Sequence, residues 1–153
     1  MAHSRRKFLK HGGILAAGGL MAANAANSIA ERLAEDFAVS DFTDRYAKLF
    51  GDQAVVDSEL IELTLPEIAE DGAVVPVTIN SELDGIDRLY LLADKNPTPL
   101  IAEFELAPVV AVHLTARIKL AESSRVTLVA RRKGQLLRCS RWVKVMRGGC
   151  GSG

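Results

Sequence analysis

The sequence has few of the residues from which active sites are usually built. Its 153 residues include two cysteines, three histidines, one tryptophan and only 5% aromatic side chains. It contains no glycine-rich phosphate loop, no nucleophile elbow, no H-E-x-x-H and no C-x-x-C motif, and its carboxylates show no spacing that singles out a pair. Enzymatic sites need several polar groups that converge in a pocket. The sequence therefore favours a protein that is not an enzyme.

No apolar run is long enough to span a bilayer, which takes about 20 apolar residues. The run over residues 12–23 is shorter, is diluted by glycine, and follows the paired Arg5 and Arg6. This layout resembles a twin-arginine (Tat) leader, and Ala23-Asn24-Ala25 fits a cleavage site. We expect residues 1–25 to be a signal peptide that exports the folded protein to the bacterial periplasm, with no membrane segment in the mature chain.

Histidine is scarce in the mature chain. His3 and His11 belong to the expected leader, which leaves His113 alone in an alternating apolar stretch with no cysteine or carboxylate cluster nearby. Metal sites need several such ligands together. We therefore expect no metal site and no bound cofactor.

Charge is unevenly distributed along the chain. The 19 basic and 19 acidic residues balance, but the mature chain keeps 15 and 19, a net charge of −4. Residues 26–116 hold five basic and 18 acidic residues, whereas residues 117–147 hold ten basic residues and one acidic residue. Such asymmetry often marks a binding surface. Small anions or an acidic protein face suit it better than nucleic acid, and residues 131–133 are expected to solvate a hairpin.

Residues 26–54 show helical spacing. Apolar side chains recur at intervals of three and four, at Ile29, Leu33 and Phe37 and then at Phe42, Tyr46, Leu49 and Phe50. This is the pattern of amphipathic helices. Ser40 with Asp44 is expected to start a second helix after a break, and Gly51 to end it. We predict a helical lead-in of two short helices.

Beyond Val55 the apolar pattern changes to period two, which indicates β-strands. The predicted strands lie in residues 61–65, 75–79, 86–92, 101–106, 109–120, 125–130 and 136–146. Turn signals separate them at Glu70-Asp71-Gly72, Asp84-Gly85, Asn96-Pro97-Thr98-Pro99, Glu122-Ser123-Ser124 and Lys133-Gly134-Gln135. About seven short strands at this spacing predict a mainly β, immunoglobulin-like β-sandwich over residues 55–147. Trp142, in the last strand, is expected to be a core or interface side chain.

Residues 148–153 surround one cysteine with glycine and serine. Glycine at a chain end stays mobile, and free cysteine is normally buried, which is impossible among such small residues. Fully extended, six residues reach roughly 20 Å. We predict a flexible arm formed by Gly148, Gly149 and Gly151 that carries the reactive sulfur of Cys150. The alternative is an incidental tail on a purely structural periplasmic sandwich.

Three motifs together resemble the SoxY family of sulfur carriers in thiosulfate oxidation. They are Pro66-Glu67-Ile68-Ala69-Glu70-Asp71-Gly72-Ala73-Val74-Val75-Pro76-Val77, Asn96-Pro97-Thr98-Pro99, and a strand ending Val143-Lys144-Val145 before Gly148-Gly149-Cys150-Gly151. The resemblance covers essentially the whole mature chain. It implies a carrier subunit that forms a heterodimer with a SoxZ-like sandwich and attaches thiosulfate-derived sulfur covalently to Cys150. It also implies partner enzymes: a haem enzyme that conjugates, a hydrolase that releases sulfate and, in some pathways, a sulfane dehydrogenase.

The terminal motif departs from the family pattern at one place. Ser152 replaces the last glycine of Gly-Gly-Cys-Gly-Gly, and Gly153 adds one residue. Serine is small and should still enter a narrow channel. Positive charge at Lys144 and Arg147 is expected to raise the thiolate fraction of Cys150 modestly.

Cys139 is a second thiol, eleven residues before Cys150. In an oxidising compartment two cysteines invite a disulfide, and a bond between them would occupy the sulfur that a carrier requires. We expect Cys139 to be a small buried strand residue. A thiol-redox protein that uses Cys139 and Cys150 as a couple is the alternative.

Overall fold

The computed structural model describes residues 31–32, 34–107 and 111–146. The chain divides into two units, one that ends at Asp36 and one that begins at Phe37. In the first unit the described residues are helical, and Arg32 Nη1 donates to Asp36 Oδ2 at 3.1 Å. The predicted signal peptide and the predicted arm both lie outside the described residues.

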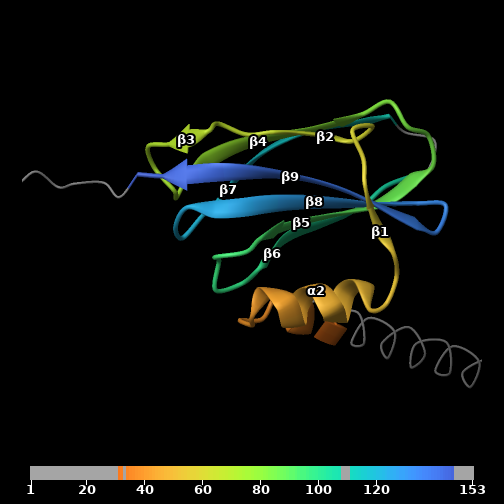
Figure 1. The fold of residues 1–153 in the computed structure, drawn as a ribbon, viewed down its shortest axis with the longest axis horizontal. Helices are drawn as coiled ribbons and strands as arrows, with labels where there is room; N and C mark the ends of the chain where they lie inside the picture. The colour runs from red at the N-terminus through yellow and green to blue at the C-terminus, as the bar shows by residue number, and fades with distance from the viewer. Residues whose placement is uncertain (1–30, 33, 108–110, 147–153) are drawn as a thin grey trace, which may run out of the picture. The chain divides into compact units, whose positions relative to one another are not determined.

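One helix and nine strands make up the described part of the second unit (Figure 1). In chain order they are α2 (Phe42–Phe50), β1 (Val55–Asp57), β2 (Glu62–Thr64), β3 (Ile68–Ala69), β4 (Val75–Ser81), β5 (Ile86–Ala93), β6 (Leu100–Glu105), β7 (Val112–Ile118), β8 (Ser124–Arg132) and β9 (Gln135–Val145). The seven predicted strands correspond to β2 and β4 to β9 and confirm the mainly β prediction. The two- and three-residue strands β3 and β1 were not predicted.

Helix α2 is bounded by capping groups. The side chain of Asp41 accepts a hydrogen bond from Thr43 N at 2.8 Å, and Gly51 ends the helix at φ +56°. Glycine adopts this left-handed conformation without a steric penalty, so the predicted end at Gly51 is confirmed. The predicted start at Ser40 is wrong by one residue, because the carboxylate of Asp41 supplies the N-cap.

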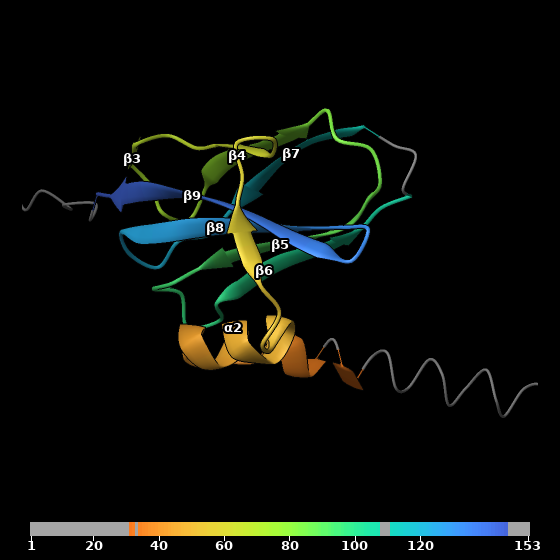
Figure 2. The ribbon, with the colours of Figure 1, turned by 45° about the vertical axis from the view of Figure 1, so that its right-hand side comes forward.

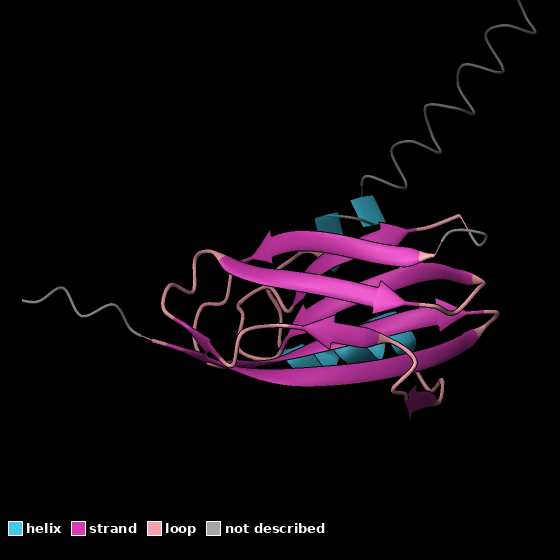
Figure 3. Cartoon of the chain, turned by 90° about the horizontal axis from the view of Figure 1, so that it is seen from above, coloured by secondary structure: helices cyan, strands magenta, loops and turns pink. Residues whose placement is uncertain are grey.

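The strands form two sheets that pack face to face (Figures 1 and 3). The larger sheet has the order β1-β9-β8-β5-β6, with β3 also paired to β9, and the smaller has the order β2-β4-β7. Alternate side chains of strands such as β4 are buried between the sheets, and the fully buried ones include Leu63, Val75, Leu89, Leu128 and Val143. Burial of a side chain of this size contributes roughly 1.5–3 kcal/mol. The predicted immunoglobulin-like sandwich is confirmed.

Helix α2 covers part of the opposite face of the larger sheet (Figure 2). Phe50 is buried there and meets Tyr90 edge to face, with ring centroids 5.2 Å apart. Leu92, Leu100, Val129 and Leu136 complete the buried part of this second cluster. The predicted amphipathic helix therefore packs on the sandwich body, and the larger sheet has apolar contacts on both faces.

The chain changes sheets twice between β1 and β3. It pairs with β9 as β1, crosses to the smaller sheet as β2, and returns to β9 as β3. The pairing of β1 reaches Arg138 and that of β3 begins at Lys144. The outer edge of β9 therefore has no strand partner over residues 139–143 in the described part of the chain.

Candidate functional site

Cys150 and the glycines at 148, 149 and 151 are outside the described residues. The structure instead defines the point from which they continue, the end of β9 at Val145 and Met146. The candidate site is therefore built from the residues that hold this end in place.

Hydrogen bonds hold the end of β9 from two sides. On one side the backbone of β9 is hydrogen-bonded to β3 and the residue before it. Lys144 N donates to Glu67 O and Met146 N donates to Ala69 O, each at 2.9 Å. On the other side the Ser123 hydroxyl accepts from Val145 N at 3.0 Å and lies 3.5 Å from Val145 O as a donor. Met146, four positions before Cys150, is thus fixed to the sandwich body.

Gly72 allows the backbone to approach β9 closely. A Cβ at this position would collide with the carbonyl oxygen of Leu120 and lie 2.8 Å from Val145 Cγ1. Leu120 N donates to Gly72 O at 2.8 Å, which locks the two segments together. No side chain fits beside the end of β9 at this position, which explains the glycine at position 72 of the Pro66–Val77 motif.

Asn96 ties the second internal motif to the same place. Its Nδ2 donates to Lys119 O at 2.8 Å, and its Oδ1 accepts from Ala121 N at 2.9 Å. The 119–123 loop is thereby held by Asn96, by Gly72 and by the contact of Ser123 with Val145. Two motifs distant in sequence converge here, and they act as supports for the end of β9.

Exposed apolar side chains surround this end. Ile68, Val74 and Met146 are 46 to 55% exposed. Ile68 lies opposite Lys144 in the β3–β9 ladder, and Val74 follows the loop that contains Gly72. Large exposed apolar side chains that gather in one region are typical of contact surfaces.

Cys139 lies on β9 opposite Leu128 and packs against the core between the sheets. It is the free cysteine of the described residues and is half-buried. Burial destabilises the thiolate and raises the pKa of the Cys139 thiol to about 11. At neutral pH this sulfur is protonated and a poor nucleophile. The expectation of a structural strand cysteine agrees with this environment.

Chain geometry opposes a disulfide between Cys139 and Cys150. The seven residues from Cys139 to Met146 follow β9 and span ~23 Å at about 3.3 Å each. From Met146 the four residues to Cys150 reach back at most ~14 Å. The remaining ~9 Å exceeds the 4.4–6.8 Å between disulfide-bonded Cα atoms, given as an approximate range. A Cys139–Cys150 couple would require the end of β9 to leave the sheet.

A groove of about 890 Å³ runs between α2 and the face of β8 and β9. Its floor includes the Thr127 and Ser140 hydroxyls, 3.0 Å apart. Arg138 donates to both oxygens of Asp57, at 2.8 and 3.1 Å, and lowers the pKa of that carboxyl. The Tyr46 hydroxyl is buried at the wall, where Asp57 and this hydroxyl together raise the pKa of Arg138.

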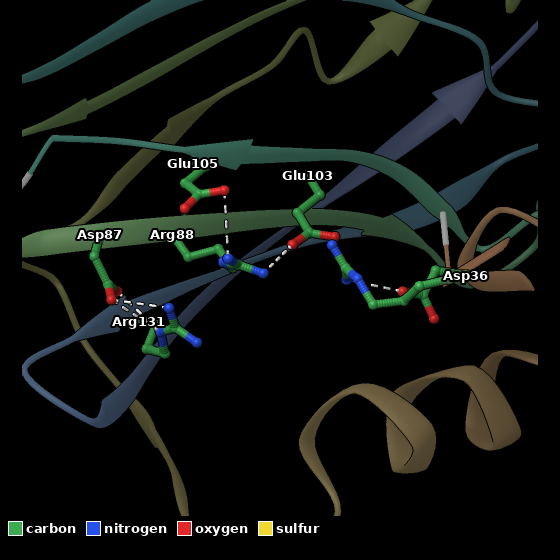
Figure 4. Close-up of polar contacts among 7 residues, drawn as sticks. Asp36, Asp87, Arg88, Glu103, Glu105 and Arg131 are labelled. Atoms are coloured by element: carbon green, nitrogen blue, oxygen red, sulfur yellow. Dashed lines mark hydrogen bonds and ion pairs between the residues drawn. The ribbon is translucent and has the colours of Figure 1, made fainter. Parts of the chain in front are cut away.

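Several residues of the basic C-terminal stretch are neutralised by acids from residues 26–116. Arg131 contacts Asp87 at 2.9 to 3.2 Å, and Arg132 contacts Asp84 at 2.6 Å. Figure 4 shows the Arg131–Asp87 pair beside Arg88, which contacts Glu103 at 2.6 Å and Glu105 at 3.5 Å. The residues expected to solvate the hairpin thus form ion pairs, and the charge asymmetry of the sequence is smaller on the folded surface.

Other candidates from the sequence stand apart from this site. His113 is exposed, and its Nδ1 lies 2.7 Å from Asn80 Oδ1 on the smaller sheet. Within residues 31–32, 34–107 and 111–146, no group of three or more His, Cys, Asp or Glu side chains is placed to hold a metal ion. No helix in this part of the chain is long and apolar enough to cross a membrane.

Trp142 is not a core residue. It lies opposite Arg125 on the face of the larger sheet that also carries α2, and it is 54% exposed. The core alternative for Trp142 is therefore wrong. The sequence reasoning also missed the contributions of Ser123 and Ile68, because the first was assigned only to a turn and the second lies in a two-residue strand. The Glu122-Ser123-Ser124 turn directly before a strand was the one local signal for Ser123.

The fold is similar to that of a sulfur carrier protein. The family model described as "Sulfur oxidation protein SoxY" matches residues 46–150, and the chain belongs to the SoxY family. The structure is similar to that of the sulfur carrier protein SoxY from Chlorobium limicola f thiosulfatophilum, with 31% sequence identity and a TM-score of 0.63. The similarity covers 70% of this chain and 97% of that one. No curated protein matches the sequence.

Proposed function

We propose that this protein is the carrier subunit that binds sulfur intermediates of thiosulfate oxidation covalently on Cys150 and presents them to partner Sox enzymes. One observation carries the proposal. In a chain of the SoxY family, the end of β9 at Val145 and Met146, four to five residues before Cys150, is fixed to the sandwich by β3 and Ser123. This anchor keeps the folded body close behind the terminal sulfur while the catalytic groups come from other proteins.

The loading step is an oxidative conjugation. The Cys150 thiolate and thiosulfate form one S–S bond and release two electrons, which the haem-containing partner accepts, to give Cys150-S-S-sulfonate. Hydrolysis of the terminal S–S bond by a second partner then consumes one water, releases sulfate and two protons, and leaves a persulfide on Cys150. Because every bond change occurs on the carried sulfur, the carrier needs no cofactor of its own.

The proposal includes location and assembly. The paired Arg5 and Arg6 before an apolar run support export by the Tat pathway to the periplasm. The carrier is proposed to act as a heterodimer with a SoxZ-like subunit. Fractionation of cells that produce the Arg5→Lys, Arg6→Lys double variant tests the location. If the protein is exported through Tat, this variant accumulates in the cytoplasm.

Intact-mass measurement tests the carrier function. The mature protein is incubated with thiosulfate, the haem-containing partner and an electron acceptor, and Cys139→Ser serves as the matched control. We expect a gain equal to one S2O3 group that is retained in Cys139→Ser and maps to Cys150. An unloaded Cys150 would refute the carrier, and a loss of two hydrogens that joins both cysteines would support the redox couple instead.

A further inference from the structure

The open edge of β9 is bounded by two backbone hydrogen bonds. At one end Ser58 N donates to Arg138 O at 2.9 Å, and at the other Lys144 N donates to Glu67 O at 2.9 Å. Backbone groups of alternate residues on a strand point the same way. The N–H and C=O groups of Ser140 and Trp142 therefore point toward the uncovered edge, where the Ser140 carbonyl accepts a hydrogen bond from Arg141 Nη1 at 3.1 Å. Such groups are a template for pairing with another strand.

Side chains beside this edge are suited to a protein contact. The groove of about 890 Å³ has Ser58 and Glu59 on one side and residues 139–141 on the other. A strand added to β9 would direct alternate side chains into it. Trp142 stands next to the groove residues on the same strand and is 54% exposed. Tryptophan is among the residues that contribute most to binding at protein interfaces.

Charge decides between a second copy of this chain and a different subunit. Antiparallel pairing of two β9 edges about Arg141 would place Arg141 directly against its own copy. Like charges directly opposite each other destabilise a strand pair. An acidic strand would instead meet the exposed Arg141 and Lys144.

We propose that the uncovered β9 edge over residues 139–143 receives an extended acidic segment of a different subunit as an added strand. This inference rests on the proposed function in one respect, because the SoxZ-like subunit is the partner that supplies the segment. The added strand would lie between β1 and β3 on the edge of the larger sheet. It would thus sit next to the hydrogen bonds that fix the end of β9.

Affinity measurements with the purified SoxZ-like subunit test the inference. Trp142→Pro removes an outward N–H without loss of a β8–β9 ladder bond, because proline is tolerated at such edge positions. We expect Trp142→Ala to weaken the complex about 30-fold, Trp142→Pro more than about 100-fold, and Arg141→Glu at least about tenfold at low salt. Arg117→Glu, the same charge change on exposed β7, is the control and should bind as the unsubstituted protein does.

Hydrogen exchange on the unsubstituted protein keeps the test independent of any folding defect. The amides of Ser140 and Trp142 should exchange readily in the free chain and become protected in the complex. A complex of full affinity with unprotected amides would overturn the proposal, as would protected amides in a homodimer. Thiosulfate loading of Cys150 is measured separately. A partner that docks elsewhere would overturn this inference without affecting the carrier function, and an unloaded Cys150 would overturn the carrier function without affecting the docking result.

Discussion

The Ser123 hydroxyl lies 3.0 Å from the backbone nitrogen of Val145, the last residue of β9. A serine from the preceding turn therefore takes the place that a neighbouring strand would fill on that side of β9. The bond links the 119–123 loop to the residue five positions before Cys150, so the loop contributes to where the terminal segment begins.

Loss of the Ser123 hydroxyl should loosen the end of β9 without unfolding the sandwich. A net hydrogen bond of this kind contributes about 1 kcal/mol, so we expect Ser123→Ala to lower the free energy of unfolding by about that amount. The amide of Val145 should exchange faster than in the unsubstituted protein. Ser123→Thr retains the hydroxyl and should restore the slow exchange; an unchanged Val145 amide in Ser123→Ala would contradict this assignment.

Gly72→Ala should destabilise the protein by overpacking. The new methyl group would collide with the Leu120 carbonyl oxygen and crowd Val145, and such insertions typically cost 1–3 kcal/mol, an approximate range. Chemical denaturation measures the change. Ala73→Ser, at the exposed next position, is the control and should stay within about 0.5 kcal/mol of the unsubstituted protein.

Cys139 should react only at high pH. Its pKa is raised to about 11 by burial, so the folded state favours the protonated thiol. The stability that this provides is present below pH 9 and is lost as the pH rises toward 11. In Cys150→Ser, alkylation by iodoacetamide should be slow at pH 8 and rise with a midpoint near 11. Fast alkylation at pH 8 would show that the thiol is not held in the core.

Cys150→Ser should abolish sulfur loading and nothing else. The substitution exchanges one atom in a residue beyond the supported end of β9, so the melting temperature and the affinity for the SoxZ-like subunit should match those of the unsubstituted protein. Intact mass after incubation with thiosulfate and the haem-containing partner gives the loading. Normal loading of Cys150→Ser would contradict the assignment of the sulfur site.

Periodicity predicted the sandwich because its long strands carry their own signal. Val75, Val77 and Ile79 alternate into the core as the sequence indicates. Strands β1 and β3 were missed because they lie outside any alternating apolar stretch, whereas the equally short β2 lies within the alternating residues 61–65, and the pairing of β1 and β3 with β9 is a long-range contact. The family resemblance stated from the three motifs is confirmed by the match over residues 46–150.

The environment of single side chains was less predictable. Trp142 is a large aromatic side chain in a strand, which favours a core position. It lies instead on the α2 face of β9, where it is more than half exposed. Gly72 and Asn96 were identified within turns and motifs, whereas their shared contact with the 119–123 loop depends on tertiary structure. The assignment of Cys150 and its glycines stays a prediction, since these residues lie outside the described part of the chain.

Under the proposed carrier function, the anchored Met146 would limit the depth at which partner enzymes can receive the sulfur. With four residues between its fixed amide and Cys150, the sulfur can enter a partner's cavity to a depth of at most ~14 Å before the body meets the rim. Ile68 and Met146 are exposed beside this fixed amide. The length of the segment from Met146 to Cys150 therefore sets the greatest depth at which a reacting centre can lie in a partner's cavity. A centre that lies deeper cannot be reached by the sulfur.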